Sequence, residues 1–170
     1  MDILMVILRL IHIFSAVIWA GLAFTMVLFI TPVVQTMGAE GGKFMQRISS
    51  GKNFRSIVPS VAGLTVLSGL IMYYRLFGFL APLNTGPGLA LTVGGLAGIL
   101  AMVDGIRLGR KQESMQALGE EIDASGKLPT PEQAASLATL QEQVAASGAI
   151  SAILMVVALA GMTLSEYLAF

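Results

Sequence analysis

The chain contains no cysteine, and it has one histidine and one tryptophan among its 170 residues. The lack of cysteine excludes disulfides, thiolate metal sites and a thiol nucleophile. Charged residues make up only 12% of the chain, which is about half the share of a typical soluble domain. Ten basic residues balance ten acidic ones, so no basic surface indicates nucleic acid as a partner.

Long apolar runs dominate what remains. Hydrophobic residues account for 55% of the chain, and the mean hydropathy is +0.81. A membrane-crossing helix needs about 20 mostly apolar residues, and four segments qualify, at about 3–30, 56–74, 87–106 and 147–168. Because backbone polar groups in lipid must be satisfied internally, we expect helices. The sequence predicts an all-α membrane protein, a four-transmembrane-helix bundle forming a single domain over residues 1–170.

The basic residues predict an orientation for this bundle. Eight of the ten lie in the connections between spans one and two and between spans three and four, namely Lys43, Arg47, Lys52, Arg55, Arg107, Arg110, Lys111 and Lys127. Only Arg9 and Arg75 fall toward the other side. Because cytoplasmic connections are enriched in Lys and Arg, we expect these two connections to be cytoplasmic and both termini to lie outside.

The connection at about 107–146 is expected to be a helical hairpin that extends spans three and four into the cytoplasm. Gly126 is a suitable helix C-cap. Thr130, Pro131 and Gln133 match an N-cap, a first helical position and a capping box. A stiff surface hairpin and a docking arm for a partner both agree with this pattern.

The linker over residues 35–55 combines glycine with a basic, partly amphipathic run. Phe44, Ile48 and Phe54 are expected to lie in the membrane interface. The four basic side chains among them would then meet anionic headgroups.

Other charged residues lie near the ends of the spans. Glu166 and Arg75 are expected to form an outer ionic cluster with Arg9. Asp104, near the inner end of span three, is expected to pair with Arg55 or Arg107.

The only histidine lies inside the first span. Ionisable residues within a membrane are costly and usually functional, and Arg9 and His12, three residues apart, share one helix face. A neutral imidazole is a good ligand for haem iron, and Arg9 is placed to hold a propionate carboxylate. Ser15 and Ala16 would leave room for a porphyrin edge, while Trp19 would pack against the macrocycle. The stripe predicts a site for haem b.

Several alternatives stay open at this point. His12 would serve equally well as a structural residue that bonds a neighbouring backbone or serine, with Arg9 snorkelling to the surface. If haem is bound, its sixth ligand would be Met162 or Met72, water, a second copy's histidine, or none. Ten methionines also suggest copper, since thioethers suit Cu(I), but they are scattered over different depths.

The first span also carries a family resemblance. The pattern I-H-I-x-x-A-x-I-W-A-G-L, followed by Pro32, resembles the first helix of the haem-binding membrane protoporphyrinogen oxidase family. It also resembles the copper-resistance D family with its small integral-membrane relatives, and FRSIVPSVAGLTVLSGL is similar to their second helix. The resemblance implies a bacterial inner membrane location and His12 as the haem ligand, with Trp19 and Gly21 at matching positions.

One departure from the oxidase pattern matters for function. The lysine that the oxidase family carries in a later span has no counterpart, because spans two to four contain no lysine. We therefore expect a haem-b protein active in electron transfer or redox support, and not an enzyme on its own. A cofactor-free accessory subunit of a respiratory or photosynthetic membrane complex, an oxidase-like enzyme and a homodimer are the alternatives.

Overall fold

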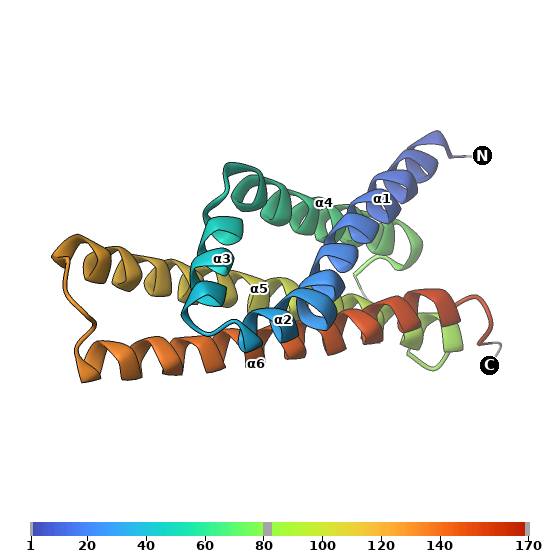
Figure 1. Ribbon diagram of the computed structural model, residues 1–170. Helices are drawn as coiled ribbons and strands as arrows, with labels where there is room; N and C mark the ends of the chain where they lie inside the picture. The colour runs from blue at the N-terminus through green and yellow to red at the C-terminus, as the bar shows by residue number, and fades with distance from the viewer. Residues whose placement is uncertain (1, 80–82, 169–170) are drawn as a thin grey trace.

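A computed structural model describes residues 2–79 and 83–168, which are almost entirely helical (Figure 1). The helices are α1 (Ile3–Thr25), a π-helical turn (Met26–Ile30), α2 (Thr31–Thr36), α3 (Ala39–Ser50), α4 (Lys52–Phe77), α5 (Gly86–Ser125) and α6 (Pro131–Leu164). Four stretches are long and apolar enough to cross a membrane: Ile3–Thr36, α4, α5 and α6. The prediction of four such helices is confirmed.

The first of these stretches continues six residues beyond its predicted end at residue 30. Pro32 lies in the first turn of α2, directly after the π-helical turn. A proline ring clashes with the carbonyl four residues earlier and lacks an N–H. A wider π turn next to the proline lets the helix absorb this defect instead of ending.

The predicted hairpin signals are confirmed as local structure. Gly126 caps α5 with a φ of 63° in the left-handed region, where glycine carries no Cβ penalty. Thr130 and Gln133 form a reciprocal capping box at the start of α6. The two helices leave the rest of the bundle side by side and turn back at residues 126–130 (Figure 1).

The bundle consists of two helix pairs. α1 packs mainly on α4, and α5 packs along α6. In the second pair the backbones approach closely, since a Cβ on Gly161 would come 2.7 Å from the Ala90 carbonyl oxygen and 2.9 Å from Gly94 Cα. Small residues allow such contacts in lipid-exposed helices. Both chain ends lie opposite the hairpin (Figure 1).

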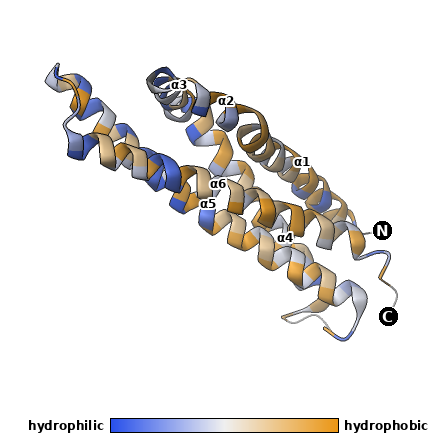
Figure 2. Cartoon of the chain, turned by 60° about the horizontal axis from the view of Figure 1, so that its bottom comes forward, coloured by the Kyte–Doolittle hydropathy of each residue, from blue (hydrophilic) through white to orange (hydrophobic). Residues whose placement is uncertain are grey.

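Hydrophilic and hydrophobic residues separate along this long axis. Hydrophobic residues dominate the part next to the chain ends, and hydrophilic residues gather toward the hairpin (Figure 2). The described side chains do not form the expected ion pairs. Arg75 pairs with Asp2 at 2.7 Å instead of Glu166, and Asp104 accepts a hydrogen bond from Ser151 at 2.7 Å. Asp2 can reach Arg75 because the start of α1 and the end of α4 lie at the same end of the bundle.

Candidate functional site

A cavity of about 1050 Å³ lies between the two helix pairs, with walls from α1, α4, α5 and α6. This is slightly above the usual range for small-molecule and cofactor sites, roughly 300–1,000 Å³. Its walls are mainly aliphatic and aromatic, and they include Ile13, Leu70, Phe77, Leu91, Ile99 and Leu159. The cavity therefore suits a large ligand that is mostly apolar.

His12 is held at the wall of this cavity by α4. Its Nδ1 lies 2.8 Å from the Thr65 carbonyl oxygen and 3.4 Å from Ser68 Oγ. The ring also rests on Gly69, where a Cβ would come 2.9 Å from His12 Cε1. A hydrogen bond from one edge and a glycine against the ring fix the orientation of the imidazole.

This orientation decides which ring nitrogen is available. A carbonyl oxygen can only accept, so Nδ1 is the nitrogen that carries the proton in the bond to Thr65. In the neutral imidazole, Nε2 then has a free lone pair. Nε2 faces α6, where Met162 Sδ lies at 3.5 Å. The site thus presents a nitrogen and a thioether sulfur, one from each helix pair.

A small polar network behind His12 joins α1 to α4. Thr65 Oγ1 donates to Ser15 Oγ at 2.9 Å, and Ser15 in turn donates to the Ile11 carbonyl at 2.6 Å. Both hydroxyls are buried. Ser15 therefore lies in the contact between α1 and α4, instead of leaving room beside a ligand, because its hydroxyl finds its partners there.

The structure brings most of the predicted site residues together. Arg9, His12, Ala16 and Trp19 all line the cavity, as their shared helix face requires. Met72 and Met162 line it as well. Of these two described methionines, only Met162 brings its sulfur to hydrogen-bonding distance of a His12 ring nitrogen. Arg9 lies one turn from His12 toward the chain ends, and its side chain is exposed.

Thr65 and Gly69 are parts of the site that sequence reasoning did not assign. Thr65 contributes through its backbone carbonyl, which no side-chain pattern reveals. Gly69 contributes through the absence of a side chain. A usable signal existed in α4, since Thr65, Ser68 and Gly69 place polar and small residues on one face of an apolar helix.

In comparisons with known proteins, no protein family, curated protein or solved structure matches the chain. Within residues 2–79 and 83–168, no three His, Asp or Glu side chains come close enough to hold a metal ion together. The donors that line the cavity include the His12 imidazole and the Met162 thioether, which lie 3.5 Å apart, as well as Met72 and Glu166.

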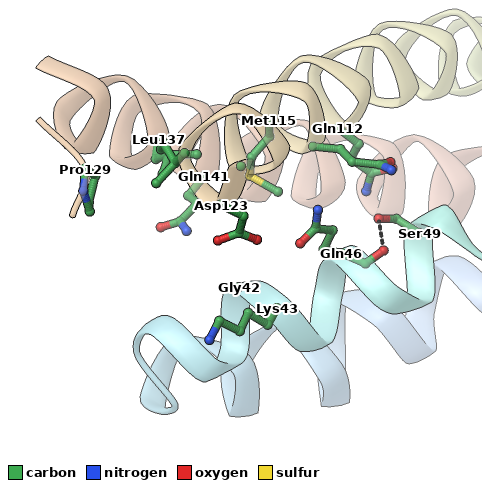
Figure 3. Close-up of a pocket in the computed structure, with 13 residues that line it drawn as sticks. Gly42, Lys43, Gln46, Ser49, Gln112, Met115, Asp123, Pro129, Leu137 and Gln141 are labelled. Atoms are coloured by element: carbon green, nitrogen blue, oxygen red, sulfur yellow. Dashed lines mark hydrogen bonds between the residues drawn. The ribbon is translucent and has the colours of Figure 1, made fainter. Parts of the chain in front are cut away.

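A second, smaller cavity of about 200 Å³ separates α3 from the hairpin. Polar and apolar side chains both line it, and Figure 3 shows side chains from both sides directed into the gap. Gln46 and Lys43 come from α3, and Gln112 and Asp123 come from α5. This cleft is smaller than the cavity around His12 and shares no lining residue with it, so the two do not form one site.

Proposed function

We propose that the chain is an integral membrane protein that binds haem b in the cavity between the helix pairs and acts in electron transfer or redox support. The observation that carries this proposal is the free Nε2 of His12 inside a largely apolar cavity of about 1050 Å³. An imidazole nitrogen is the commonest protein ligand of haem iron in b-type sites and globins. Haem, when bound, supplies one-electron chemistry at its iron.

The remaining cavity residues fit the parts of such a group. Met162 would offer a thioether sulfur to the same group as His12, and a methionine ligand beside a histidine raises the reduction potential of a haem. Nε2 and Sδ lie 3.5 Å apart, and the unbranched, rotatable Met162 side chain could move to make room for a group between them.

The charged and aromatic groups fit the periphery of a tetrapyrrole. Arg9 carries a guanidinium that pairs well with a carboxylate, here a propionate. Trp19 offers an aromatic wall against the macrocycle. The chain's own residues thus bind the ligand, orient it and keep water from its faces.

The proposal includes an orientation in the bilayer. The basic residues near the hairpin support a cytoplasmic hairpin and termini on the outer side of a bacterial inner membrane. The haem would then lie nearer the outer side, since Arg9 and His12 lie about 9 and about 14 Å along the helix from the start of the first span.

The experiment is an absorption spectrum of the protein purified in gentle detergent from cells supplied with haem. We expect a Soret band from the wild-type protein and its loss in His12→Ala, because no other histidine is available. Added imidazole is expected to restore the band in His12→Ala, because it can occupy the space left by the side chain. If imidazole restores the Soret band, the variant is folded and lacks only the ligand that the His12 side chain provides.

A colourless wild-type protein would contradict haem binding. A Soret band that survives in His12→Ala without imidazole would show that His12 is not the ligand. Met72→Leu serves as a matched control, since it changes a cavity wall residue and leaves the His12 contact in place.

A further inference from the structure

Charges at the hairpin end are sorted by sign along the long axis. We call residues 40–55 and 107–113 the basic collar, which contains two acidic residues, Glu40 and Glu113. Its seven basic residues are Lys43, Arg47, Lys52, Arg55, Arg107, Arg110 and Lys111. Residues 114–146, the outer part of the hairpin, carry five acidic residues and one basic residue. A basic band therefore lies between the apolar spans and an acidic tip.

Contacts between helices place Arg55, Lys111 and Glu113 near one level, whereas the start of α3 lies further out along the hairpin, with Gln46 beside Gly119. Arg55, at the start of α4, bonds Glu113 of α5 at 3.2 Å. Lys111 of α5 bonds Ser147 of α6 at 3.2 Å. Residues 107–113 rise by about 9 Å along a helix, slightly more than a headgroup layer of roughly 5–8 Å per leaflet. The collar begins where the apolar stretches end and continues outward along the hairpin through α3.

Much of the positive charge in the collar is left without an acidic partner. Glu40 and Glu113 bond Lys43 and Arg55, and both pairs are exposed. Among the described residues, no ion pair or side-chain hydrogen bond is formed by Arg47, Lys52, Arg107 and Arg110, which are exposed. A group of unpaired exposed cations repels itself unless anions lie beside it.

α3 combines these cations with an apolar side chain. Phe44 is 43% exposed and lies three residues before Arg47 on the same helix. An exposed aromatic ring beside a cation is typical of helices that lie in the membrane interface. The cleft behind α3 carries the amides of Gln46 and Gln112 together with the carboxylate of Asp123 (Figure 3).

We propose that the basic collar binds the headgroups of anionic phospholipids in the leaflet at the hairpin end. The collar supplies complementary charge, and Phe44 supplies an exposed apolar side chain about one helical turn from Arg47. The acidic outer hairpin has the charge of the leaflet, so repulsion holds it away from the surface. This inference rests on the membrane orientation proposed above and is independent of haem binding.

The experiment uses the full chain, delipidated in detergent. Phosphatidylglycerol and phosphatidylcholine with the same acyl chains are added separately, and retained lipid and the unfolding midpoint are measured. We expect phosphatidylglycerol to be retained more and to raise the midpoint more. This difference is expected to shrink as salt rises, because salt screens exposed charges.

The test variant is Arg47→Gln/Lys52→Gln, which removes two unpaired cations. Each cation near an anionic surface contributes enough that the pair is expected to weaken phosphatidylglycerol binding by about 30-fold. Arg75→Gln/Lys127→Gln is the matched control, since it removes two positive charges outside the collar. Its retention of phosphatidylglycerol is expected to equal that of the wild type.

Equal retention of the two lipids by the wild type would overturn the proposal, as would equal losses in the test and control variants. The same midpoint shift with inorganic phosphate would show a general anion site and no lipid site. If the test variant does not fold, the salt dependence of phosphatidylglycerol retention by the wild type still tests whether charge drives the binding. Absorption spectra of the same samples report haem separately, so the two proposals fail independently.

Discussion

Polar side chains find their partners in different ways at the cavity and at the hairpin end. At the cavity, His12 is 9% exposed and bonds a backbone carbonyl on another helix. At the hairpin end, Arg55 and Glu113 form a pair whose side chains are 49% and 63% exposed. Among the described side chains, no buried nitrogen or oxygen lacks a hydrogen-bond partner.

The difference follows from the solvent. Where water is excluded, each polar group needs a fixed protein partner, because an unpaired one costs several kcal/mol. Where water is present, charges can be satisfied by solvent, and an exposed ion pair contributes little. Single substitutions should therefore have large effects at the cavity and small ones at the hairpin end.

The largest effect is expected from Gly69→Ala. Its Cβ would come 2.9 Å from His12 Cε1, so the imidazole must shift away from the Thr65 carbonyl. We expect at least a tenfold loss of haem affinity, measured by titration and the Soret band. Gly63→Ala is the control on the same helix, because a Cβ there meets nothing within 4 Å. Equal haem loss in both variants would contradict the proposed role of Gly69.

Gly161→Ala should destabilise the α5–α6 pair. The added Cβ would meet backbone atoms of Ala90 and Gly94, and such overpacking typically costs about 1–3 kcal/mol. The measurement is the free energy of unfolding in detergent. Gly105→Ala, where a Cβ meets nothing within 4 Å, should be close to the wild type. A stable Gly161→Ala would mean that the two helices are not packed as closely as this contact requires.

Met162→Leu is expected to change the haem without removing it. Leucine keeps the side chain apolar and similar in size but provides no sulfur for the iron, so the potential should fall. Redox titration followed by absorbance measures this change. Met72→Leu should leave the potential unchanged, since Met162 is the methionine recorded next to Nε2. The reverse result would transfer the role to Met72.

The smallest effect is expected at the hairpin end. Arg55→Gln removes an exposed pair with Glu113, and pairs of this kind contribute less than about 1 kcal/mol. Chemical unfolding of the wild type and the variant at low and high salt measures the difference. A loss of unfolding free energy comparable to that of Gly161→Ala would contradict the expected weakness of exposed pairs at the hairpin end.

Much of the fold was predictable from local signals. Gly126 and the Thr130–Gln133 capping box fixed the turn of the hairpin, because caps act over three or four residues. The continuation of the first helix past Pro32 was not predictable from the proline alone. A proline either ends a helix or distorts it. Here the helix continues because the preceding residues form a π turn, which the proline by itself does not predict.

The candidate site was predictable on one helix and not across helices. Periodicity placed Arg9, His12, Ala16 and Trp19 on one face of α1, and all four line the cavity. The same periodicity placed Ser15 near that face, but its hydroxyl bonds Thr65 of α4. Helical spacing gives the direction of a side chain, and the partner depends on which helix packs against it.

The sequence by itself determined the four apolar helices, the hairpin and the sorting of charges, because these depend on composition and spacing along one chain. Tertiary structure alone decided that His12 turns its Nδ1 to Thr65 and its Nε2 toward Met162. Thr65 and Met162 are separated from His12 by 53 and 150 positions along the chain. Contacts over such separations arise from packing, where Gly69 leaves space for the ring and α6 lies opposite it.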